Sequence, residues 1–210
     1  MAANLHEIEA VLRLVNRDVW IVTAADGRRR GGLTATWVLP ASIDSQRPVL
    51  LAAIAPNHYT AELIDASGAF AAHLLRPEQT DLAYDFGRDS GRERDKFQGQ
   101  IVTAAETGSP ILADCLAWCD CRVFHRFDAG DRLFFWADVI AARAPSPPAP
   151  LPHGAGGTEP RPLVAALGRE RGESSQPLCE QEFFRSLSGE QRANLLAGRD
   201  ADVKIQRPKY

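Results

Sequence analysis

What the 210-residue sequence lacks excludes several classes of protein. It has no basic excess, because 24 lysines and arginines are outweighed by 27 acidic residues, so we expect no nucleic-acid partner. No apolar run approaches the roughly 18 residues of a transmembrane helix, so we expect no membrane partner. The opening MAANLHEIEA lacks the basic and then apolar stretch of a secretory signal. These absences predict a cytoplasmic protein.

Motifs for metals, nucleotides and side-chain catalysis are missing as well. The four cysteines (Cys115, Cys119, Cys121 and Cys179) lack the paired C-x2-C spacing of zinc sites, and no two of the five histidines form a metal-binding pair. We therefore expect no metal, and cysteines that act as small buried apolar side chains. G-x-S-x-G, P-loop and G-x-G-x-x-G patterns are also missing. The sequence offers no catalytic residue, so its chemistry points to a borrowed cofactor.

Apolar spacing predicts a protein of strands in runs with a few helices. Helices are expected at 5–16, 58–67 and 77–86, and strands at 18–24, 33–39, 48–54, 68–75, 116–127 and 132–143. Asp26-Gly27 and the segment 128–131 are typical of hairpin turns. Because no βαβ rhythm recurs, a mainly β fold is favoured: a twisted antiparallel barrel with helical excursions.

The C-terminal part differs in composition from the rest. Residues 144–162 form an extended arm rich in proline and glycine, and 162–168 could add a short strand. Two helices are expected after Cys179, the second opening on Ser188 and Gln191 in a capping-box pattern. We expect one domain over 1–172 that includes the arm, and a helical tail over 173–210 that adds dimer contacts or covers the site.

Several fragments in a fixed order resemble one known family. GLTATWVLPAS begins at Gly32, a long apolar segment runs over 48–75, and Asp95-Lys96-Phe97, CDCRV (119–123) and Ala129-Gly130-Asp131 follow. Over about residues 8–168 the chain resembles the flavin reductase-like, FMN-binding split β-barrel family. The resemblance implies a Greek-key-like antiparallel barrel and a homodimer. It also implies FMN rather than FAD as cofactor, NAD(P)H as a possible co-substrate, and a monooxygenase or other electron acceptor as a possible partner.

The resemblance, read with residue chemistry, indicates where a flavin would be held. Hydroxyls and amides of 34–38 suit the polar edge of the ring, and residues 57–60 open a helix whose amides favour a phosphate. Turn chemistry at 41–42, a simple N-cap at Asn57 and a solvated charge at Lys96 remain alternatives. The expected cofactor-binding residues are Thr34, Ala35, Thr36, Trp37, Val38, Ala41, Ser42, Asn57, His58, Tyr59, Thr60, Lys96 and Phe97.

Two departures from the family pattern bear on the activity. His73 stands where the family often has asparagine, and Arg132 where it has a histidine associated with the nicotinamide side. Both are therefore expected on a possible nicotinamide or partner side. Three hypotheses follow: an FMN-dependent oxidoreductase that takes hydride from NAD(P)H, an FMN electron-transfer protein without that activity, and a split-barrel interaction module without cofactor.

Overall fold

A computed structural model describes residues 4–12, 14–145 and 177–195. The strands are β1 (Trp20–Asp26), β2 (Arg29–Ala35), β3 (Val38–Pro40), β4 (Val49–Ile54), β5 (Ala69–Leu74), β6 (Val102–Ala104), β7 (Pro110–Leu112), β8 (Ala117–Asp128) and β9 (Leu133–Arg143). The helices are α1 (Leu5–Leu12), α2 (Tyr59–Ser67), α3 (Thr80–Arg88) and α4 (Glu180–Ser186). A further helical stretch covers 189–195.

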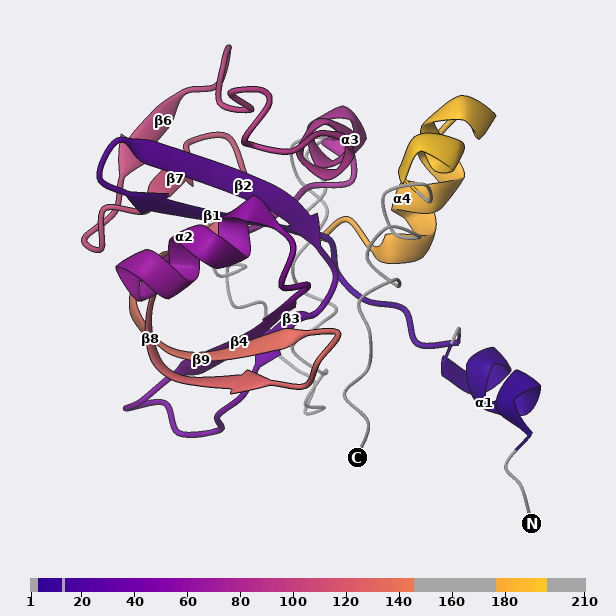
Figure 1. Cartoon of the computed structure of the whole chain (residues 1–210), viewed down its shortest axis with the longest axis horizontal. Coiled ribbons are helices and arrows are strands. Elements are labelled where there is room, and N and C mark those ends of the chain that lie inside the picture. The colour runs from indigo at the N-terminus through magenta and orange to yellow at the C-terminus, as the bar shows by residue number, and fades with distance from the viewer. Residues whose placement is uncertain (1–3, 13, 146–176, 196–210) are drawn as a thin grey trace, which may run out of the picture.

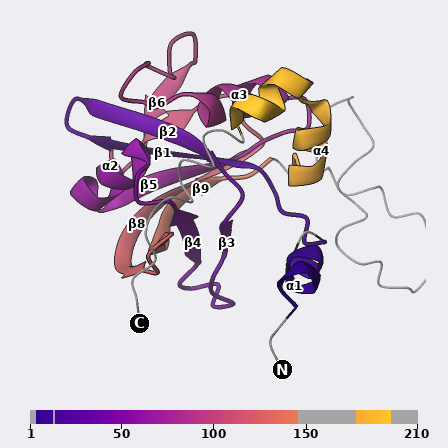
Figure 2. The ribbon, with the colours of Figure 1, turned by 45° about the vertical axis from the view of Figure 1, so that its right-hand side comes forward.

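Seven strands form one antiparallel sheet in the order β2-β1-β5-β8-β9-β4-β3. Its two edge strands, β2 and β3, follow each other in the chain with only Thr36 and Trp37 between them. Three Cα steps reach about 11 Å at most, so the sheet must curl until its edges come close. The result is an antiparallel barrel split between β2 and β3, as Figures 1 and 2 show. The predicted fold class is confirmed.

Two hairpins set the register of this sheet. Asp26 pairs with Arg29 across a turn in which Gly27 has φ +60°, a conformation that glycine adopts without strain. The long β8–β9 hairpin turns at Gly130, where φ is +90°. Both turns lie where the sequence predicts them.

Two apolar cores lie on opposite faces of β1. Val22 and Ala24 face the inside of the barrel, where α2 plugs the space with Leu63 and Ile64. Ile21 faces the other way, into a core covered by α3 and the C-terminal segment. Both faces of β1 are buried, which explains the almost continuous apolar run of this strand.

The C-terminal residues 177–195 pack against the barrel. Leu178, Phe183 and Leu187 are buried in the second core, at most 5% exposed. The capping box is confirmed, because Ser188 Oγ accepts from Gln191 N–H and Gln191 Oε1 accepts from Ser188 N–H. Figure 2 shows this segment beside α3.

Some local expectations were wrong. The strand predicted over 33–39 is two strands, because the chain leaves one edge of the sheet at Ala35 and enters the other at Val38. The first helix ends at Leu12, and its apolar side chains are exposed, since it stands apart from the sheet (Figure 1). The small β6–β7 ladder was not predicted. The possible strand at 162–168 lies outside the described residues.

The expectation of buried cysteines is confirmed for two of the four. All four cysteines are free; Cys115 and Cys121 are buried and the other two half-buried, and burial raises the pKa of the Cys121 thiol. No helix in the described part of the chain is both long and apolar enough to cross a membrane.

Candidate functional site

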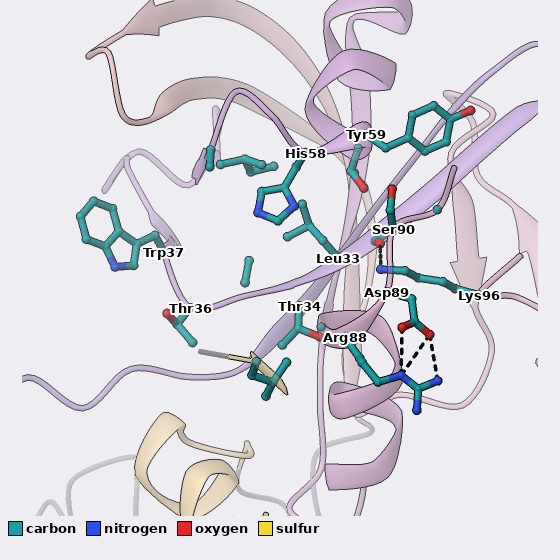
Figure 3. Close-up of a pocket in the computed structure, with 18 of the residues that line it drawn as sticks. Leu33, Thr34, Thr36, Trp37, His58, Tyr59, Arg88, Asp89, Ser90 and Lys96 are labelled. Carbon is teal, nitrogen blue, oxygen red and sulfur yellow. Dashed lines mark hydrogen bonds and ion pairs between the residues drawn. The ribbon is translucent and has the colours of Figure 1, made fainter. Parts of the chain in front are cut away.

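A large cavity opens where the barrel splits. It lies between the crossing from β2 to β3, the N-terminal turn of α2, and the end of α3 with the loop after it (Figure 3). Its volume of about 860 Å³ falls in the upper part of the range of small-molecule and cofactor sites. The C-terminal segment forms a further wall.

The crossing itself is anchored to α3. Thr34 Oγ1 donates to the carbonyl of Ala83 over 2.5 Å. Gly32 packs against the Phe86 ring so tightly that a Cβ there would lie 2.7 Å from a ring carbon. Because β2 is held this closely, Ala35 and Thr36 are carried into the cavity wall.

The N-terminus of α2 faces the cavity. The N-cap residue is His58, whose backbone is extended and whose side chain makes no capping hydrogen bond, so the alternative reading of Asn57 as the N-cap is wrong. The first amides of an α-helix have no acceptor within the helix and carry the positive end of its dipole. In Figure 3 the His58 imidazole points into the middle of the cavity. This end of the site suits an anionic group.

Lys96 is buried in the cavity wall and is not a solvated charge. Its Nζ donates to the carbonyls of Gly32, over 2.9 Å, and Phe86, over 2.6 Å, so it joins β2 to the end of α3. Only 8% of the residue is exposed, and burial lowers the pKa of its ammonium group to about 8. The ammonium is therefore mostly charged at neutral pH and brings a positive charge to this end of the cavity.

The loop after α3 adds charged pairs that the sequence did not suggest. The Arg88 guanidinium donates to both carboxylate oxygens of Asp89 over 2.8 to 3.0 Å, which raises the pKa of Arg88 and lowers that of Asp89. Arg92 pairs with Glu62 over 2.6 Å and lies 5.0 Å from the centre of the Tyr59 ring. The contacts of Arg92 hold the loop against α2.

The far end of the cavity, which we call the tryptophan end, consists of Arg17, Trp37, Arg132 and Glu180. The guanidinium carbons of Arg17 and Arg132 lie 5.7 and 5.8 Å from the centre of the Trp37 ring. Arg17 also pairs with Glu180 at the start of α4, over 3.3 Å. Five basic and three acidic side chains line the whole cavity, a local basic excess in a chain of net charge −3.

The structure brings together most of the residues expected to bind the cofactor. Those that line the cavity are Thr34, Ala35, Thr36, Trp37, Asn57, His58, Tyr59, Thr60 and Lys96, and Arg132 joins them from the β8–β9 turn. The crossing and the helix start meet because β2 and α2 pack on each other.

Four of the expected cofactor-binding residues lie elsewhere. Val38 is buried in the barrel core, and Phe97 packs edge-on against Phe86 in the second core, so neither reaches the cavity. Ala41 and Ser42 follow β3 outside it, where Ser42 Oγ accepts from the amide of Asp44 in a simple turn.

His73 is a structural residue of the interior. Its Nδ1 lies 3.0 Å from the Ile21 carbonyl, and its Nε2 accepts from the amide of Leu112 over 3.1 Å. Both ring nitrogens are thus used by the neutral form, and burial lowers its pKa to about 4. The expectation that His73 lies on the nicotinamide or partner side is therefore wrong: the residue is 0% exposed.

Sequence reasoning missed two groups of cavity residues. The loop of 87–93 was read only as charged and turn-rich, although its glycines and serine are compatible with close approach to a ligand. The tail was expected to add dimer contacts or cover the site, but no local signal singled out Phe183, Phe184 and Leu195 as the residues that line the cavity. Among the described residues no group of three or more histidine, cysteine or acidic side chains could hold a metal.

Fold and site together define a protein of the FMN-binding split-barrel type. It is a half-open antiparallel barrel with a basic cavity at the split, and the N-terminus of α2 faces this cavity. Residues 12–160 match the flavin reductase like domain family. The chain belongs to this family.

Three curated relatives illustrate the range of the family. The chain is 31% identical over 140 residues to actinorhodin polyketide dimerase of Streptomyces coelicolor, covering 66% of this chain and 76% of that protein. It is 29% identical over 136 residues to the NADH-dependent FMN reductase AsuE2 of Streptomyces nodosus subsp. asukaensis, covering 63% of this chain and 71% of that protein. It is 27% identical over 138 residues to diflavin flavoprotein A 1 of Synechocystis, covering 65% of this chain and 24% of that protein. This chain therefore spans about a quarter of that longer protein.

Solved structures show the same fold. An FMN-binding protein from Thermus thermophilus is similar with a TM-score of 0.58 and 26% identity, covering 62% of this chain and 71% of that one. Nitrilotriacetate monooxygenase component B from Mycobacterium thermoresistibile is similar with a TM-score of 0.61 and 23% identity, covering 78% and 96%.

Proposed function

We propose that this protein is an FMN-dependent oxidoreductase of the flavin reductase type, with the flavin in the cavity at the split of the barrel. The observation that carries the proposal is the convergence of the β2–β3 crossing, the uncapped start of α2 and Lys96 on one basic cavity. The similarity to an NADH-dependent FMN reductase and to an FMN-binding protein supports this assignment.

The residues present fit FMN. The phosphate needs amide donors and positive charge, which the first turn of α2 and Lys96 supply. The polar edge of the ring needs donors and acceptors, and the backbone and hydroxyl of Thr36 stand on the adjoining wall. The volume of about 860 Å³ leaves space for a second molecule beside the flavin.

When bound, the flavin would supply the redox chemistry, accepting a hydride from NAD(P)H. The protein would bind and orient. Thr34 and Lys96 fix β2 against α3, so the wall that carries Ala35 and Thr36 keeps one geometry. The α2 amides hold the anionic end, and His58 faces the middle of the cavity.

An absorbance spectrum of the purified full chain, with and without added FMN, tests the proposal. We expect a bound flavin that NADH or NADPH bleaches, and a Thr36→Val variant whose dissociation constant for FMN is about fivefold higher, the effect of one hydrogen bond. Thr103→Val, on the exposed strand β6, is the matched control and leaves FMN binding unchanged. A protein that binds no added FMN would refute the proposal.

A second candidate, an FMN electron-transfer protein that does not use NAD(P)H, is favoured by Arg132. This arginine lines the cavity where members of the family that the chain resembles carry a histidine. The relatives also include proteins not named as reductases, such as the polyketide dimerase. A flavin that is bleached by dithionite but by neither NADH nor NADPH would favour this candidate over the first.

Assembly and layout are part of the proposal. We propose a homodimer that passes electrons to a monooxygenase or another acceptor; the fold shared with a monooxygenase component supports the partner. We also propose that residues 1–172 form the flavin domain and 173–210 a tail that covers its cavity. Sedimentation of the purified protein at several concentrations tests the dimer.

A further inference from the structure

The tryptophan end of the cavity differs in chemistry from the Lys96 end. Trp37 lies at one side of the cavity in Figure 3, and Lys96, Asp89 and Arg88 lie at the other, with His58 between them. Trp37 is 40% exposed, although it lines a cavity. An indole surface of this kind is suited to contact a planar ring.

Arg132 brings a positive charge to this indole. Its guanidinium carbon lies 5.8 Å from the Trp37 ring centre, and its Nη1 donates to the backbone carbonyl of Asp131 over 2.7 Å. Within the described ranges no carboxylate forms an ion pair with it, in contrast to Arg17, which pairs with Glu180. A guanidinium offers a fork of donors that matches a carboxylate, so Arg132 has capacity to bind one.

The C-terminal segment closes this end with apolar surface. The amide of Val19 donates to the carbonyl of Leu178 over 2.7 Å, and the amide of Glu180 donates to the carbonyl of Arg17 over 2.6 Å. These hydrogen bonds hold the segment against the residues that precede β1. Phe183 and Phe184 then line the cavity. This wall lies beyond residue 160, where the family match ends.

We propose that the tryptophan end is a second subsite, which binds a planar aromatic carboxylate. The ring of this ligand lies between Trp37 and the wall of Phe184, and its carboxylate pairs with Arg132. The subsite rests on the proposed function in one respect: the flavin occupies the remainder of the cavity.

Calorimetric titration of the full chain with 2-naphthoate, and with the neutral 2-naphthalenemethanol, tests the subsite. We expect 2-naphthoate to bind about tenfold more tightly, the effect of one charge-assisted hydrogen bond. Arg132→Gln removes this preference and leaves the neutral compound unaffected. Trp37→Leu and Phe184→Ala weaken the binding of both compounds. Repeating the titration with saturating FMN is expected to leave the dissociation constant for 2-naphthoate within about threefold.

Arg47→Gln is the matched control, since this arginine also lies over an aromatic ring, 4.9 Å from the centre of Phe124, but away from the cavity. Equal binding of the two compounds, or a preference that survives Arg132→Gln, would overturn the proposal. So would competition between 2-naphthoate and FMN, because the tryptophan end would then hold the flavin ring. A protein that binds 2-naphthoate as expected but no FMN refutes the proposed function and leaves the subsite standing.

Discussion

The buried ammonium of Lys96 makes the stability of the protein depend on alkaline pH. Burial lowers its pKa from 10.5 to about 8. Between these values the unfolded chain binds a proton that the native protein has released, so stability rises with pH. Burial of the charge lowers the free energy of unfolding by about 3 kcal/mol at neutral pH and by about 1 kcal/mol near pH 9.5. Between these pH values the free energy of unfolding therefore rises by about 2 kcal/mol because of this group.

The measurement is urea unfolding of the wild type and of Lys96→Met near pH 7 and near pH 9.5. The pH dependence from Cys115, Cys119 and Cys121 opposes that of Lys96, because burial raises the pKa of each thiol and stability falls as the unfolded thiols ionise. Both proteins share those cysteines, so the difference between them isolates Lys96. From pH 7 to pH 9.5 we expect the free energy of unfolding of the wild type to rise by about 2 kcal/mol relative to that of the variant. A relative gain near zero, or a loss, would refute the reasoning.

Three further predictions concern packing and titration. Gly32→Ala places a Cβ 2.7 Å from the Phe86 ring and should cost about 1 to 3 kcal/mol in urea unfolding, while Gly189→Ala, with nothing within 4 Å, costs far less. Burial lowers the pKa of His73 from 6.5 to about 4, so between these pH values the unfolded chain binds a proton that the native protein does not. The free energy of unfolding should therefore fall by up to about 3 kcal/mol as the pH falls from 6.5 to 4, measured against His73→Gln. Phe183→Ala, at a side chain 3% exposed, should lower the unfolding free energy by about 3 to 5 kcal/mol; a loss below 1 kcal/mol would show that the C-terminal wall is loosely packed.

The barrel was predictable because its signals are local. Hairpin turns at Gly27 and Gly130 and the apolar runs that flank them specify neighbouring antiparallel strands. The start of α2 was predictable for the same reason, and with it the helix terminus that faces the cavity. In these parts the residues that determine the structure lie within a few positions of one another.

The separate roles of similar residues were not predictable. Lys96 and Phe97 are adjacent in the sequence, but Lys96 lines the cavity and Phe97 lies in the second core. The packing of their loop against β2 and α3 decides which of the two side chains reaches the cavity. His73 has the residue type of a catalytic group, but its strand places it between two backbone partners in the interior. Which face of an element meets the cavity depends on packing with elements far away in the chain.

The sequence by itself determined the mainly β barrel, its hairpins and the resemblance to a flavin-binding family. It also pointed to two segments of the cavity wall, 34–37 and 57–60. Only the tertiary structure decided that the predicted strand of 33–39 breaks between Ala35 and Val38 and which residues of the C-terminal segment line the cavity. The pair Arg17–Glu180 joins residues 163 positions apart. Periodicity reports how a segment folds against its neighbours, whereas such a contact depends on where the whole sheet curls, so it appears only when the chain is folded.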